Sequence, residues 1–125
     1  ILLVLNQNIA HSADPMVEQQ AINIAEAYLD EILNQSYADA NGVCTGESRA
    51  TLDSVQDYVQ GSACLPDTVV RDDQGTAVSG LTNYSVSVAL TPTTLGGISA
   101  TRVDVNVSYT PTNISLTLSG YRTNY

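Results

Sequence analysis

The chain has 125 residues, which is the length of one ordinary domain with a single modest core. It contains no Lys, Phe or Trp, and its thirteen acidic residues outnumber four Arg to give a net charge of −9. Nucleic acids and anionic membrane surfaces are bound by basic patches, so this charge balance argues against both as partners.

The chain opens on five aliphatic residues, Ile1 to Leu5, without the basic region or the small-residue cleavage site of a signal peptide. About 20 apolar residues are needed to cross a bilayer, so these five cannot span one. We expect them to be the tail of a truncated hydrophobic segment that enters a soluble domain. A signal-peptide remnant and an extra core strand are the alternatives.

Residues 14–36 have the pattern of an amphipathic helix. Asp14 and Pro15 are typical of an N-cap and a first helical residue. One half of the helix surface is apolar and is expected to pack on a sheet. Its residues are Val17, Ala21, Ile22, Ile24, Ala25, Tyr28, Leu29, Ile32 and Leu33. We expect the aliphatic start to continue this helix through a kink at Pro15, so that the helical region covers 1–36.

Residues 37–81 predict a variable loop region, because turn residues are frequent and no apolar period is sustained. A short helix over 48–58 is compatible with the spacing of Leu52, Val55 and Val59.

The two cysteines, Cys44 and Cys64, lie in this loop region. Structural zinc needs four ligands, and the single His11 is distant, so we expect a disulfide instead of a metal site. In the chain-entropy model, a loop of this length would contribute about 3 kcal/mol. Two buried free thiols are the alternative.

A calcium site is a weaker hypothesis for the same region. Asp67, Asp72 and Asp73 precede Gly75 and offer hard oxygen ligands, but their spacing is not that of an EF-hand. The alternative is a set of turns that use Asp and Gly for backbone reasons. No other cofactor is indicated.

Residues 82–125 predict an antiparallel sheet. Apolar and polar residues alternate over 83–90, 103–109 and 114–119, and the connections 93–100 and 110–113 are short enough for consecutive strands. Three strands with one apolar face need a cover, which the helix can provide. The predicted fold is α+β, with one long helix on an antiparallel sheet, in a single domain covering 1–125.

No nucleophile and base pattern is evident, so we expect no enzymatic activity. His11 lies in a polar stretch and is expected to be a surface residue. A second hypothesis is a carbohydrate-binding or surface-binding module, in which tyrosines form a stacking platform. The candidate platform residues are Tyr58, Tyr84, Tyr109 and Tyr121, and the favoured alternative for the last two is packing or hydrogen bonding at strand ends.

An apolar start, a soluble helix and a disulfide-containing β-meander resemble the type IV pilins and the pseudopilins of type II secretion. Residues 12–21 (SADPMVEQQA) and 25–32 (AEAYLDEI) resemble minor pilins of the mannose-sensitive haemagglutinin (MSHA) pilus type. Residues 102–105 (RVDV) and 116–125 (LTLSGYRTNY) strengthen this similarity. The resemblance covers the helix and the last strands, which make up about half of the chain.

The resemblance implies a minor pilin of a Gram-negative bacterium that takes part in pilus assembly and adhesion. Its precursor would be anchored in the inner membrane, with a periplasmic domain, before incorporation into an extracellular pilus. Its partners would be other major and minor pilins and the assembly machinery, joined by helix packing. The residues assigned to this helix face are Val17, Ala21, Ile24, Tyr28, Leu29 and Ile32. The prepilin cleavage motif and the assembly glutamate of the family are absent from these 125 residues.

Overall fold

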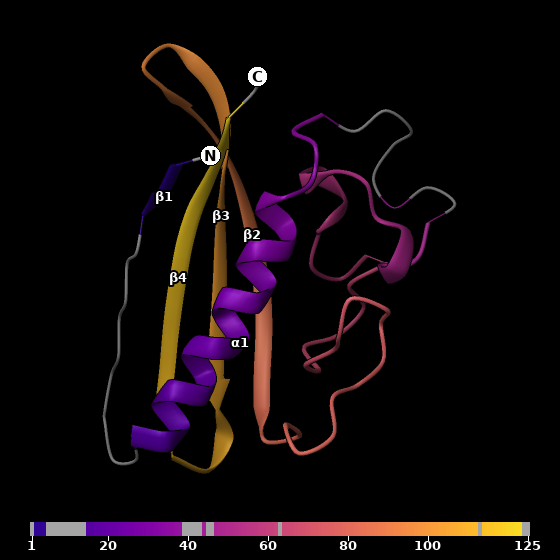
Figure 1. Ribbon diagram of the computed structural model, residues 1–125, viewed down its shortest axis with the longest axis vertical. Coiled ribbons are helices and arrows are strands. Elements are labelled where there is room, and N and C mark those ends of the chain that lie inside the picture. The colour runs from indigo at the N-terminus through magenta and orange to yellow at the C-terminus, as the bar shows by residue number, and fades with distance from the viewer. Residues whose placement is uncertain are drawn as a thin grey trace.

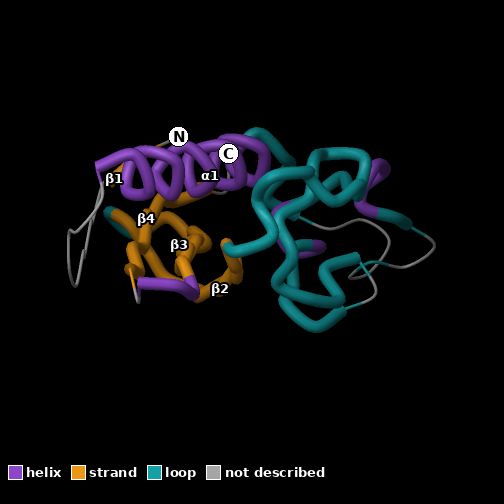
Figure 2. The backbone as a smooth tube through the Cα atoms, turned by 90° about the horizontal axis from the view of Figure 1, so that it is seen from below, coloured by secondary structure: helices purple, strands orange, loops and turns teal. Residues whose placement is uncertain are grey.

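A computed structural model describes residues 2–4, 15–38, 44, 47–62, 64–112 and 114–123. One α-helix, α1 (Pro15–Leu33), lies across one face of an antiparallel β-sheet (Figure 1). Figure 2 shows these two layers, with the described loops that follow α1 lying beside the β2 edge of the sheet. The fold is therefore α+β, as predicted. No described helix is long and apolar enough to cross a membrane.

The three predicted C-terminal strands form a consecutive antiparallel meander. They are β2 (Tyr84–Leu95), β3 (Ile98–Tyr109) and β4 (Ile114–Thr123), with the 3₁₀ turn η3 (Thr110–Thr112) before β4. The predicted connection over 93–100 is too long, because β2 and β3 stay paired to their ends at Leu95 and Ile98. Only Gly96 and Gly97 remain in the turn, and both have a positive φ (57° and 83°), as a tight hairpin turn requires.

The prediction of a continuous helix over 1–36 is wrong at its start. Leu2–Val4 form a short strand, β1, that pairs antiparallel with residues 119–121 of β4, and α1 begins only at Pro15. The sheet order is therefore β1-β4-β3-β2. Five aliphatic residues carry no period that separates a helix from a strand, and the edge of β4 offers backbone groups that a strand can pair. Asp14, the predicted N-cap, lies outside the described residues.

The core lies between α1 and the sheet. The predicted apolar face of α1 is buried, apart from Ile22, which is half-buried. Alternate sheet residues face this helix and are at most 5% exposed, namely Val86, Val88, Val103, Val105, Val107, Leu116 and Leu118. Because the chain's own sheet covers the helix face assigned to assembly, a neighbouring subunit would have to contact other residues.

The region after α1 contains two 3₁₀ turns, η1 (Arg49–Thr51) and η2 (Val55–Asp57), in place of the α-helix predicted over 48–58. The backbone at Ser54 is extended (φ −146°, ψ 158°), so the chain leaves the helical conformation between the two turns. The neighbouring Val55 N–H donates to the backbone oxygen of Ser36 at 2.9 Å. This bond to the segment that follows α1 is a tertiary contact that helical spacing does not reveal.

Candidate binding groove

A buried ion pair fastens the loop region to α1. Arg49, from η1, is 8% exposed, and its Nη1 donates to Oε2 of Glu31 on α1. The guanidinium carbon lies 5.1 Å from the ring centroid of Tyr28 and 5.8 Å from that of Tyr58. Tyr58 donates its hydroxyl to the same Glu31 oxygen at 2.7 Å. A charged group can be buried here because it has an ionic partner and two aromatic faces.

Burial and the neighbouring charges shift two pKa values in this cluster. Burial raises the pKa of the Tyr58 hydroxyl well above its ordinary value, and the hydrogen bond to Glu31 and its charge add to the increase. Burial by itself would lower the pKa of Arg49, but the hydrogen bond and charge of Glu31 raise it above its ordinary value. Both groups therefore keep their neutral pH protonation state, which suits a structural role.

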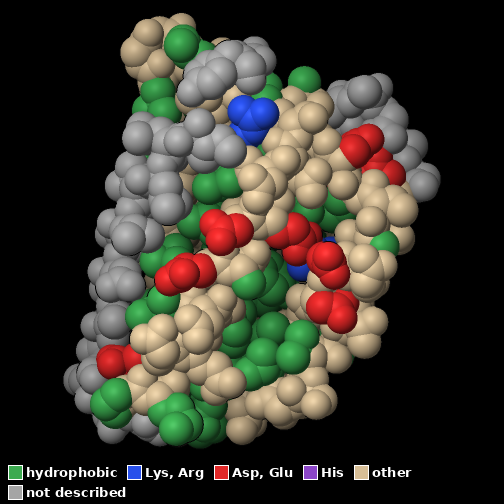
Figure 3. Space-filling view, in the orientation of Figure 1, with side chains coloured by type: hydrophobic (Ala, Val, Ile, Leu, Met, Phe, Trp, Pro, Cys, Tyr) green, Lys and Arg blue, Asp and Glu red, His purple; other side chains and the backbone are tan. Residues whose placement is uncertain are grey.

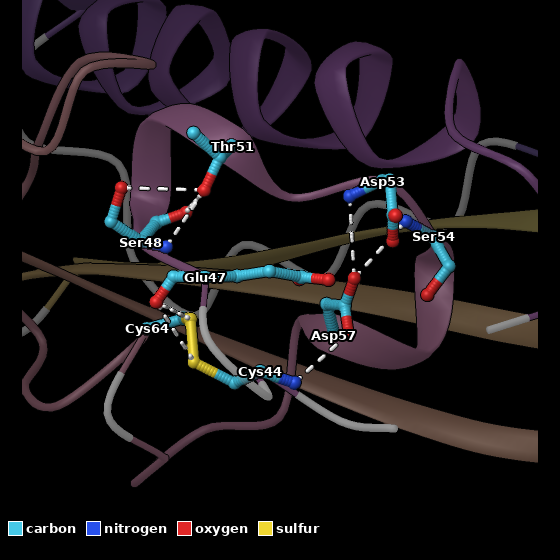
Figure 4. The surroundings of a disulfide bond; sticks show 8 residues. All are labelled: Cys44, Glu47, Ser48, Thr51, Asp53, Ser54, Asp57 and Cys64. Carbon is cyan, nitrogen blue, oxygen red and sulfur yellow. Dashed lines mark hydrogen bonds between the residues drawn. A yellow bond between two sulfur atoms is a disulfide. The ribbon is translucent and has the colours of Figure 1, made fainter. Parts of the chain in front are cut away.

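The predicted disulfide between Cys44 and Cys64 is present, with the two Cα atoms 6.0 Å apart (Figure 4). The two sulfurs lie 3.9 and 3.6 Å from the backbone oxygen of Glu47. Next to it, the fully buried Asp57 accepts backbone N–H bonds from Cys44 at 3.0 Å, Asp53 at 3.3 Å and Ser54 at 3.2 Å. The cross-link joins residue 44 to residue 64, and the Asp57 carboxylate joins residue 44 to residues 53 and 54.

Three carboxylates beside the disulfide could contribute to a metal site. One oxygen from each of Glu47, Asp53 and Asp57 lies within 4.8 Å of the others, and Figure 4 shows the Glu47 and Asp57 side chains converging. Calcium takes six to eight oxygen ligands. Three carboxylates supply only part of that number, and Asp57 already accepts three N–H bonds.

The predicted calcium residues Asp67, Asp72 and Asp73 are not such a group among the described residues. Asp67 pairs with Arg71, whose Nη2 lies 2.8 Å away, and this hydrogen bond lowers the pKa of Asp67. Asp72 accepts the backbone N–H groups of Gln74 at 3.0 Å and Thr76 at 2.9 Å. These acids stabilise a turn, which is the alternative explanation of their pattern.

A groove of about 670 Å³ lies between α1 and residues 70–81, and we call it the α1 groove. Its apolar lining comes from both walls: Ile24, Ala27 and Tyr28 on α1, and Val70, Val78 and Leu81 opposite. The walls are joined at Tyr28, whose hydroxyl accepts the backbone N–H of Arg71 at 2.8 Å. In Figure 3 the hydrophobic floor is visible from outside, with acidic side chains beside it.

Three of the polar side chains that line the α1 groove are acidic. They are Glu31, Asp72 and Asp73, and the lining also includes Gln20 and Asn23 on the helix side. Among the described residues of the lining the one cation is Arg71, which is held by Asp67 and by the backbone oxygen of Gly75 at 3.0 Å. The sequence singled out Asp72 and Asp73 only as possible calcium ligands, because their placement opposite Glu31 depends on how the loop folds back on α1.

The tyrosine platform is wrong as a binding surface. Tyr58 is 1% exposed and Tyr84 is 5% exposed, so neither offers a free face to a sugar. Tyr84 instead stacks in a tilted geometry against Tyr109, its partner across the β2–β3 pair, with ring centroids 4.8 Å apart. Tyr121, on β4, is half-buried. His11 lies outside the described residues.

Comparisons with family models, with curated proteins and with solved structures find no match to this chain.

Proposed function

We propose that this chain is a pilin-like structural subunit, a minor pilin of a type IV pilus of the MSHA kind, resembling the D-type subunit. The observation that carries the proposal is the packing of α1 across the β2–β4 meander, with a disulfide-closed segment between the two in sequence. This is the arrangement that the resemblance implies. The similar stretches 12–21 and 116–125 supply the more specific assignment.

A structural role also suits the polar groups of the described residues. Glu31 on α1 accepts hydrogen bonds from Arg49 and Tyr58, and these bonds connect the helix to the loop region. Such a cluster stabilises a scaffold, and its hydrogen-bonding groups are used within it. We therefore assign the chain no catalytic step.

Strand β1 sets a requirement for the proposal. In the pilin resemblance the segment before α1 is helical, whereas Leu2–Val4 pair with β4 in this structure. The proposal therefore requires that β1 can leave the sheet without unfolding α1 and the meander.

The inner membrane would hold the precursor, and the periplasmic domain would later become part of an extracellular pilus.

The test is whether the chain is present in filaments. Surface filaments are sheared from the native bacterium, and the sheared fraction is probed with an antibody against this chain, with a strain lacking the prepilin peptidase as control. We expect the chain in the sheared fraction of the wild type and its loss from that fraction in the control. Recovery of the chain as a soluble periplasmic protein in both strains would contradict the proposal.

A type II secretion pseudopilin is the alternative within the same class, since the resemblance covers both groups. Deletion of the gene separates them. Loss of surface pili with normal export of secreted enzymes supports a minor pilin, and the opposite result supports a pseudopilin.

A further inference from the structure

The α1 groove combines an apolar floor with an acidic border. Ile24 and Val70 in its floor are 6% and 4% exposed, so this floor is firmly packed beneath. Three carboxylates belong to the lining: Glu31 is already paired with Arg49, whereas Asp72 and Asp73 are exposed. A long cationic side chain matches this combination, because its methylene stem covers apolar surface while its charged head stays among carboxylates.

The chain's own cations already have partners, including Arg71, which pairs with Asp67. Arg49 is buried against Glu31, and Arg71 already forms part of the groove lining. Arg102 pairs with Asp104 at 3.0 Å. Arg122 donates to the backbone oxygens of Gln35 at 2.9 Å and Thr123 at 2.7 Å.

A second copy of the chain is a poor occupant of the groove. The four Arg are the only Lys or Arg side chains in the sequence, and the net charge of −9 makes two copies repel each other. An acid-bordered groove on such a chain is complementary to a basic partner with a different sequence. Charge complementarity of this kind mainly governs encounter and selectivity.

We propose that the α1 groove binds a basic amphipathic segment of a different protein chain, with a Lys or Arg stem on the apolar floor and its charged head among the carboxylates. In the proposed filament this segment would belong to a neighbouring subunit that is not a copy of this chain, and that part of the inference rests on the proposed function.

The probe is a short capped peptide of alternating Leu and Lys, titrated into the isotope-labelled 125-residue chain and followed by NMR and calorimetry. We expect amide shifts at α1 and residues 70–81, and a Kd that rises as salt screens the charges. Two control peptides replace every Lys by Ser or every Leu by Ser, and both should bind at least about fivefold more weakly. Equal binding of either control peptide, or shifts confined to residues away from the groove, would overturn the proposal.

A charge-matched pair of variants locates the site. Asp72→Asn with Asp73→Asn removes two groove charges, and the amide introduced at position 72 keeps a side-chain oxygen for the N–H groups that Asp72 now accepts. We expect this double variant to bind the Leu/Lys peptide about fivefold more weakly. Glu26→Gln with Asp30→Asn removes the same charge from exposed helix positions outside the groove lining and should bind within about twofold of the wild type. If both double variants lost the same peptide affinity, the attraction would be nonspecific, and this result would contradict the assignment of the site to the α1 groove.

Ala27→Arg provides a complementary test, because Ala27 is exposed, lines the groove and lies on α1. Arg is a good helix former, so the helix should persist while the new side chain occupies the groove. We expect about tenfold weaker peptide binding, against little change for Gln19→Arg outside the lining. Unaltered binding in Ala27→Arg would place the peptide elsewhere.

Since the peptide assay needs no filament, its failure is distinguishable from absence of the chain from sheared pili.

Discussion

Arg49 shows how a single side chain can join two parts of a fold. Its guanidinium packs against the rings of Tyr28 and Tyr58 and bonds to Glu31. Removing one partner of a buried pair leaves the other charge without compensation, which costs more than the pair itself contributes. These residues share no spacing rule, because they come from α1 and from separate turns. The cluster could not be predicted from the sequence for that reason.

Arg49→Met should lower the free energy of unfolding by about 3 kcal/mol, because Glu31 then loses its cation in a partly buried site. Adding Glu31→Gln should restore part of the loss, since the uncompensated charge is removed. Urea denaturation of the two single variants and the double variant measures this coupling. Strictly additive losses would show that the two residues do not act as a pair. Arg102→Met, at a more exposed pair, is the control and should change stability little.

The raised pKa of Tyr58 predicts a loss of stability in alkaline solution. Its pKa is raised in the folded chain above the ordinary value of 10.0, so the unfolded chain releases this proton first as the pH rises. The contribution of the Tyr58 hydroxyl to the free energy of unfolding is fully present below about pH 10 and is lost progressively as the pH rises above it. Urea denaturation at about pH 8 and about pH 11 should show a smaller alkaline loss for Tyr58→Phe than for the wild type. The same pH dependence in both chains would contradict the assigned cause.

At the scale of elements, the helix and strands whose apolar residues recur at a regular spacing could be predicted from the sequence. The apolar face of α1 and the alternation in β2, β3 and β4 are properties of local sequence, and the structure confirms them. The prediction for the start of the chain is wrong, because a short aliphatic run fits either a helix or the β1 strand. The α1 groove could not be predicted, since its walls come from α1 and the loop that returns to it.

The disulfide should stabilise the loop region more than the sheet. Cys44→Ser with Cys64→Ser opens a cross-link with a sequence separation of 20 and should lower the free energy of unfolding by about 3 kcal/mol. Hydrogen exchange should become faster mainly in residues 47–62, where Asp57 organises the backbone, while β3 stays protected. Equal loss of protection in β3 and in residues 47–62 would contradict this division. Reduction of the wild type should reproduce the variant.

At the scale of the whole molecule, stability is concentrated in the two layers formed by α1 and β2–β4. The core residues lie on these elements and on the loop packed beside them. Strand β1 pairs with only three residues of β4, at the edge of the sheet. A strand this short contributes few backbone hydrogen bonds, each of modest net value.

Deletion of residues 1–13 should therefore leave a folded chain. We expect the free energy of unfolding to fall by about 2 kcal/mol at most, because only the β1 pairing with residues 119–121 is lost from the described contacts. Circular dichroism, together with NMR shifts of core valines such as Val105, checks that α1 and the meander persist. A disordered product would contradict the requirement that the proposed function places on β1.

The bond between the Tyr28 hydroxyl and the Arg71 backbone has a mechanical consequence. It tethers the turn that carries Asp72 and Asp73 to the helix, and a neutral hydrogen bond of this kind has a net value of about 1 kcal/mol. Thermal energy can break such a tether at times while the disulfide and the Arg49 cluster hold the remainder of the loop in place. Because Val70 of the opposite wall belongs to the core, the movement that follows is confined to the turn that carries Asp72 and Asp73.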